Sequence, residues 1–116
     1  MSVLMKNEQM IAGLVPSDSG WLTTTAVNGN TVQYRKIGNQ VWVRRGTIGT
    51  TTGGSWTTIG VLPEGFRPSA NVSHCIYSEN NGSTYGNAQV LSNGNVNSIA
   101  NINNSVPAFF FSFLVD

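Results

Sequence analysis

The stretch from Asn30 to Ser69 constrains the fold of this chain most, because it repeats short β-rich segments separated by Asn and Gly. An Asn-Gly or Gly-Asn link between two such segments is the strongest short-range signal of a β-hairpin, since the favoured two-residue turns need positive φ. A Pro-Glu-Gly-Phe-Arg-Pro corner at residues 63–68 ends the stretch. The stretch therefore predicts a ladder of strands and tight turns.

The same pattern covers the rest of the chain after residue 20. The strands that we expect span residues 21–27, 31–37, 40–45, 56–62, 70–77, 87–91, 96–100 and 108–115. About eight short strands at this spacing indicate an antiparallel sandwich or barrel. A chain of 116 residues is long enough for one domain with one modest core. We therefore expect an all-β, jelly-roll-like antiparallel β-sandwich or barrel.

The first twenty residues differ from this pattern. Their apolar side chains recur at a spacing near seven, which suits one or two turns of a helical bundle, at Val3, Leu4, Met10, Ile11, Leu14 and Val15. Pro16 and Gly20 then interrupt the pattern. Two interpretations stay open, a tether and the end of an oligomeric stalk. We place the boundary after Gly20, so that residues 1–20 form a neck or stalk end and residues 21–116 the head.

The charge of the chain disfavours two classes of partner. Charged residues make up only 9% of the sequence, and the formal net charge is +1. Binding to nucleic acid or to an anionic membrane surface depends on clustered Lys and Arg. We therefore expect neither partner. The sequence also lacks an apolar run long enough for a membrane span and the pattern of a signal peptide.

Two features point to a subunit interface. Alternation along residues 40–45 places Val41 and Val43 on one face and Trp42 on the other, where Trp42 packs under a second layer or meets a neighbouring subunit or ligand. The last strand is apolar on both faces, and covering both requires more protein than so small a chain supplies. We therefore expect an oligomer interface formed by Trp42, Phe109, Phe111 and Phe113.

The sequence offers little for catalysis. Metal sites need three or four convergent ligands, and the neighbours His74 and Cys75 point to opposite faces of a strand. Carboxylates are too few to favour a paired-acid hydrolase, and no local nucleophile motif is present, although a triad assembled from distant residues stays open. We expect no enzymatic activity, no metal and no cofactor.

Residues 77–85 and the strand after them combine aromatic rings with amides and hydroxyls. Sugars are bound by stacking on aromatic rings and by several hydrogen bonds to neutral amides and carboxylates. A surface loop without a ligand is the alternative. The side chains that we expect to bind a saccharide are Tyr77, Glu79, Asn81, Tyr85, Asn87, Gln89 and His74.

Four segments also carry a family resemblance: Gly20-Trp21, residues 32–46, residues 59–69 and residues 90–96. In this order they resemble the C-terminal head domains of receptor-binding and tail-fibre proteins of siphophages that infect Gram-positive bacteria, especially lactococcal baseplate proteins. The resemblance covers about residues 21–116. It implies a homotrimer of β-sandwich heads on a neck and helical stalk, assembled with other tail or baseplate proteins in the virion.

The resemblance also implies that such a head recognises saccharides or phosphate-linked polyols of the host cell wall without chemistry. The family's ligand pocket uses histidine, acidic and tryptophan side chains around a late Ser-x-Gly turn. Here Asn87, Gln89 and Ser98 flank the corresponding turn. Two other functions stay open at this stage, a purely structural trimeric baseplate or fibre module and a glycan-cleaving tail enzyme.

Overall fold

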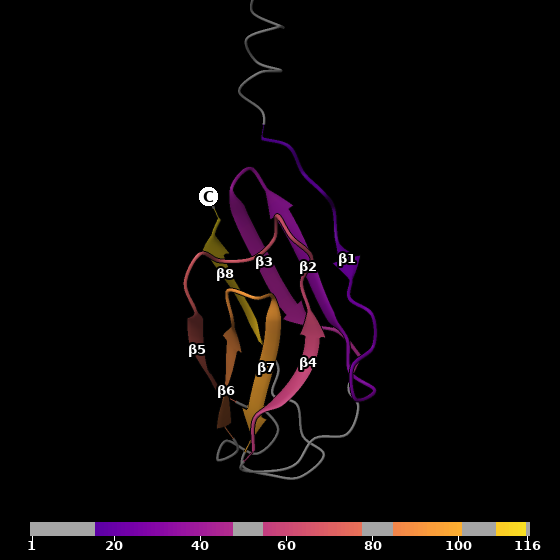
Figure 1. The fold of residues 1–116 in the computed structure, drawn as a ribbon, viewed down its shortest axis with the longest axis vertical. Helices are drawn as coiled ribbons and strands as arrows, with labels where there is room; N and C mark the ends of the chain where they lie inside the picture. The colour runs from indigo at the N-terminus through magenta and orange to yellow at the C-terminus, as the bar shows by residue number, and fades with distance from the viewer. Residues whose placement is uncertain (1–15, 48–54, 78–84, 101–108, 116) are drawn as a thin grey trace, which may run out of the picture.

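Eight strands in two antiparallel sheets make up the part of the chain that the computed structural model describes, residues 16–47, 55–77, 85–100 and 109–115 (Figure 1). The first sheet has the order β1 (Leu22–Thr23), β2 (Val32–Ile37), β3 (Gln40–Arg45) and β8 (Phe110–Leu114). The second has the order β4 (Thr57–Val61), β7 (Asn95–Ala100), β6 (Tyr85–Val90) and β5 (Val72–Tyr77). The predicted all-β antiparallel sandwich of short strands is confirmed.

The predicted Asn-Gly turn before β2 has the expected backbone geometry. Asn28 and Gly29 both have positive φ, 53° and 75°, as a type I′ turn requires. Val27 and Asn30 on either side exchange backbone hydrogen bonds of 2.8 and 2.9 Å. This is the hairpin geometry that the Asn-Gly pair predicts.

The first predicted strand, residues 21–27, is wrong in length, because β1 spans only Leu22–Thr23. The ladder ends at Thr24 for a local reason. The N–H of Thr24 donates to the carbonyl of Val32 at 2.9 Å, but the N–H of Val32 donates to the Thr24 hydroxyl at 3.0 Å instead of to a backbone carbonyl. A side chain therefore replaces one half of the backbone pair, as threonine hydroxyls often do.

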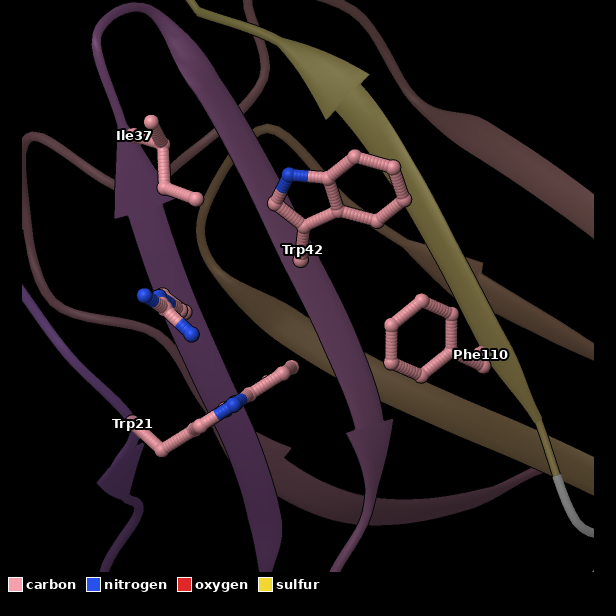
Figure 2. A pocket seen from close by; sticks show the side chains of 5 residues that line it. Trp21, Ile37, Trp42 and Phe110 are labelled. Atoms are coloured by element: carbon pink, nitrogen blue, oxygen red, sulfur yellow. The ribbon is translucent and has the colours of Figure 1, made fainter. Parts of the chain in front are cut away.

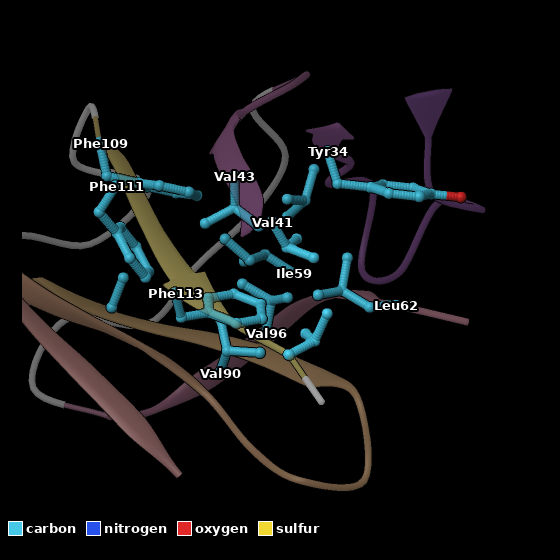
Figure 3. Packing of buried hydrophobic residues seen from close by; sticks show 13 residues of the cluster. Tyr34, Val41, Val43, Ile59, Leu62, Val90, Val96, Phe109, Phe111 and Phe113 are labelled. Carbon is cyan, nitrogen blue, oxygen red and sulfur yellow. The ribbon is translucent and has the colours of Figure 1, made fainter. Parts of the chain in front are cut away.

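The core lies between the two sheets (Figure 3). Its buried apolar residues come from both of them: Val32, Tyr34, Val41, Val43, Ile59, Leu62, Ala88, Val90, Val96, Phe109, Phe111, Phe113 and Val115. The alternating burial along β2 and β3 follows the period of two that a half-buried strand has. The side chains between the core residues therefore lie on the outer face of the first sheet.

Strand β8 divides its aromatic rings between these two faces. Phe111 pairs with Val43 and Phe113 with Val41, and Phe109, Phe111 and Phe113 are each 7% exposed. Phe110 and Leu114 point the other way and are 57% and 66% exposed. The second sheet thus supplies the cover for one face of β8, which the sequence argument assigned to another subunit. Whether Trp42, Phe109, Phe111 and Phe113 take part in an interface stays a prediction.

The Pro-Glu-Gly-Phe-Arg-Pro corner packs against the first sheet. The ring of Phe66 packs edge-on against Tyr34 with 5.0 Å between centroids. The Lys36 ammonium donates to the carbonyl of Gly65 at 2.7 Å, and the Arg67 Nε donates to the carbonyl of Leu62 at 2.8 Å. These bonds connect the corner after β4 to β2.

Residues 17–20, which we call the strap, run alongside β2. The N–H of Ser19 donates to Lys36 at 3.0 Å, the N–H of Gly38 donates to Ser17 at 2.8 Å, and Asp18 pairs with Ile37. The strap therefore brings Trp21, the residue after it, to the edge of the first sheet. The division of the chain after Gly20 stays a prediction. No helix among the described residues is long and apolar enough to span a membrane.

Candidate functional site

Aromatic side chains gather on the outer face of the first sheet. Arg35 pairs with Trp42, which pairs in turn with Ser112, so these three side chains form one row on that face. Leu22 pairs with Tyr34, and alternation therefore places Trp21 at the β1 end of the same row. Phe110 lies in the adjacent row, opposite Arg44.

These side chains surround a hollow of about 180 Å³ that is lined by Trp21, Arg35, Ile37, Trp42 and Phe110. The Phe110 centroid lies 5.6 Å from that of Trp42 and 6.0 Å from that of Trp21. Figure 2 looks onto this face, with the rings of Trp42 and Phe110 seen nearly face-on and the ring of Trp21 nearly edge-on. Two rings thus offer their faces, and the third forms a wall beside them. We call this site the aromatic hollow.

The guanidinium of Arg35 is held in place by the strap. Its Nε donates to Oδ1 of Asp18 at 2.9 Å, and its Nη2 bonds Oδ2 of the same carboxylate. These hydrogen bonds, together with the N–H of Gly20 at 2.9 Å from Oδ1, lower the pKa of Asp18 from its usual 3.8 to about 2. The hydrogen bonds between the two side chains raise the pKa of Arg35. Both groups are therefore charged at neutral pH, and their charges balance.

Arg44 supports the wall of the hollow. Its guanidinium carbon lies 3.7 Å from the centre of the Trp21 ring, a cation–π contact, and its Nε donates to Oε1 of Gln33 at 2.7 Å. Arg44 does not line the hollow itself. Since Trp21 belongs to no long strand, its ring is held by this contact together with Phe110 and the strap.

The saccharide-binding residues expected from the sequence are only partly described. The exposed ring of His74 stacks on Phe111 with centroids 5.0 Å apart. His74 pairs with the core residue Ala88, whereas Asn87, the residue before Ala88 in β6, faces the other way. The structure therefore does not bring His74 together with Asn87 and Gln89.

Asn87 and Gln89 lie on the outer face of the second sheet. Gln89 is in register with Ser73 and Asn97, and the Thr58 hydroxyl donates to Oδ1 of Asn97 at 2.8 Å. The described side chains of this row are thus amides and hydroxyls without a ring. Tyr77 and Tyr85 pair through their backbones, but their side chains lie outside the described part of the chain, as do Glu79 and Asn81.

The sequence predicts only part of the aromatic hollow. Trp42 was expected on the far face, but its partners Trp21, Arg35, Ile37 and Phe110 were not assembled with it. Alternation marks all of them as outward-facing, yet their meeting depends on the β3–β8 pairing, which joins residues far apart in the sequence. Among the described residues, no three His, Cys, Asp or Glu side chains converge as a metal site requires.

No protein family model matches this chain, and no curated protein is significantly similar to it.

Proposed function

We propose that this domain is the head of a bacteriophage receptor-binding protein, which binds a saccharide of the host cell surface without catalysis. In this proposal the head acts as a homotrimer at the tail tip or baseplate of the virion, together with other tail proteins. The observation that carries the proposal is the aromatic hollow, where three exposed or half-exposed rings meet on one sheet face.

The shape of the hollow supports a sugar as its ligand. The apolar face of a pyranose ring stacks well on an aromatic ring, and hydroxyls at its edge need hydrogen-bonding groups nearby. Trp42 and Phe110 supply adjacent ring faces, and Arg35 supplies donors beside them. The volume of about 180 Å³ is smaller than that of a drug-sized pocket, so the site suits a single ring.

A small open site of this kind binds weakly on its own. Linking several weak sites raises the overall affinity by a factor of roughly 100 to 10,000 without any new contact. A trimeric head, present in many copies on a virion, links several such sites. The proposal therefore expects weak binding by the isolated domain and tight binding by the multivalent particle.

The test is binding of the isolated domain to purified cell-wall polysaccharide from a panel of Gram-positive bacteria, measured by calorimetry. Trp42→Ala is expected to remove binding, because it deletes one ring face of the hollow. Trp56→Ala is the matched control, since Trp56 is 46% exposed just before β4 and does not line the hollow. Failure of the wild-type domain to bind any of the polysaccharides would refute the proposal.

Variants at Tyr77 and Tyr85 decide between this site and the one that the sequence predicts. If the aromatic hollow is the site, Tyr77→Ala and Tyr85→Ala keep the affinity of the wild-type domain. If these two variants lose binding while Trp42→Ala keeps it, the ligand binds beside β5 and β6 instead.

A structural module that only trimerises is the second candidate, and the apolar surface of β8 favours it. Phe110 and Leu114 are exposed on the same face, and β8 forms an edge of its sheet. An edge strand with apolar side chains is prone to pair with another chain. Trimerisation that persists without any polysaccharide binding would support this alternative.

A further inference from the structure

We infer that the aromatic hollow takes a neutral sugar ring and discriminates against acidic sugars, and that Asp18 sets this preference. The inference rests on the proposed function, since it names the class of saccharide bound at the same site.

The charge inside the hollow comes from one guanidinium. Among the residues that line the hollow, Arg35 carries the only formal charge. A guanidinium normally recognises carboxylate or phosphate through two parallel hydrogen bonds. Here the carboxylate of Asp18 already occupies such a pair of donors, Nε and Nη2. One of the two bidentate donor pairs of this guanidinium is therefore taken by the protein itself.

Arg35 has N–H donors that do not bond Asp18. A guanidinium has more N–H donors than the pair that Asp18 uses, so donors are left for neutral acceptors such as sugar hydroxyls. A ligand carboxylate placed there would lie close to the Asp18 carboxylate, which remains ionised because its pKa is about 2. Two negative charges so close together repel each other. Neutral hydroxyls meet no such opposition.

Arg44 does not form an anion site within the hollow. Its guanidinium lies against the ring of Trp21 and bonds Gln33, and it is not part of the lining. The remaining lining consists of the rings of Trp21, Trp42 and Phe110 and the aliphatic side chain of Ile37. The hollow thus presents an apolar platform beside a charge-balanced pair of side chains.

Matched oligosaccharides test the inference directly. The probes are gluco-, galacto- and manno-oligosaccharides, the corresponding hexuronate oligomers, and a glycerol phosphate oligomer. We expect the wild-type domain to bind at least one neutral probe, with an affinity that changes less than about twofold between low and high salt because no net charge is recognised. Its hexuronate counterpart is expected to bind at least about tenfold more weakly.

Asp18→Asn is the variant that removes the preference. It keeps a side-chain oxygen for Arg35 and removes the negative charge, so the hexuronate is expected to gain about tenfold in affinity relative to the wild-type domain. Glu64→Gln is the matched control, because Glu64 is exposed in the 63–68 corner and its replacement changes the net charge equally. Circular dichroism verifies that both variants fold. If Asp18→Asn does not fold, the salt dependence of binding by the wild-type domain still tests the inference.

The outcomes separate the inference from the proposed function. Salt-sensitive binding of a hexuronate or of the glycerol phosphate oligomer, as tight as or tighter than that of the neutral probes, overturns the inference. If that binding is lost in Trp42→Ala, the proposed function survives. If no probe binds and no host polysaccharide binds, both fail. An unchanged preference in a folded Asp18→Asn domain refutes the role of Asp18.

Discussion

Phe111→Ala and Phe110→Ala form a pair of substitutions that tests where strand β8 is buried. The two residues are neighbours of identical type on one strand, but Phe111 is 7% exposed in the core and Phe110 is 57% exposed on the outer face. Phe111 pairs with Val43, stacks on His74 and contacts the tilted ring of Phe109. The two variants therefore remove the same atoms from opposite sides of the sheet.

The expected losses differ several-fold. Replacing a core Phe by Ala costs about 3–5 kcal/mol, because it removes transfer free energy and leaves a cavity. At about 4–8 °C per kcal/mol, the melting temperature of Phe111→Ala falls by roughly 12–40 °C. Phe110→Ala loses mainly its ring contacts with Trp42 and Trp21, about 1 kcal/mol in sum at this exposure.

Urea unfolding at several protein concentrations measures both the losses and their origin. If the chain covers Phe111 itself, the loss in Phe111→Ala is the same at every protein concentration. A loss that grows on dilution would mean that a second subunit covers the ring, as the sequence argument expected. Equal losses in the two variants would refute the assignment of the faces of β8.

Three further predictions concern single contacts. Gly94→Ala is expected to cost at least about 2 kcal/mol of stability, because Gly94 has a φ of 97° and a Cβ there would collide with the Leu62 carbonyl. Gly65→Ala is the control: Gly65 has a φ of 87° with open space around it, so this variant isolates the backbone cost of about 1–2 kcal/mol. Equal thermal shifts in the two variants would disprove the collision. Because the pKa of Asp18 is lowered to about 2, its contribution to stability is complete above its usual pKa of 3.8 and is lost as the pH falls toward 2. Urea unfolding of Asp18→Asn is expected to show no such dependence of the unfolding free energy on pH between these two values. An unchanged dependence would contradict the pairing with Arg35. Ser98→Ala is expected to leave stability unchanged or raise it by up to about 1 kcal/mol, because the buried Ser98 hydroxyl has no hydrogen-bond partner among the described residues; a clear loss in calorimetry would show that it has one.

The hairpins were predictable because their signal is local. The Asn28-Gly29 pair needs only two residues of positive φ, and alternation along β3 sufficed to place Trp42 outside the core. The first strand was overestimated because the Thr24 hydroxyl bonds the Val32 N–H, an interaction that β-propensity does not encode. Sequence patterns thus located the strands better than their ends.

The aromatic hollow was not predictable because it depends on pairing between distant segments. Phe110 reaches Trp42 only when β8 pairs with β3, and Trp21 reaches Arg35 only when the strap pairs with β2. The sequence shows that β8 is apolar on both faces, but it does not show which face meets the second sheet. The structure places Phe111 on that face, where it is buried, and Phe110 on the opposite face, where it is exposed. The register of the sheet thus decides which side chains are buried, because a shift of one residue would turn every side chain of the strand to the opposite face.

The three tryptophans offer the most direct test of the proposed saccharide site. Trp21 and Trp42 line the aromatic hollow, whereas Trp56 lies outside it, so each indole N–H gives a separate NMR signal that reports on one place. On titration of the ¹⁵N-labelled domain with a neutral oligosaccharide that it binds, the signals of Trp21 and Trp42 are expected to shift together while that of Trp56 stays. Saturable binding that leaves the Trp21 and Trp42 signals unmoved would contradict the account.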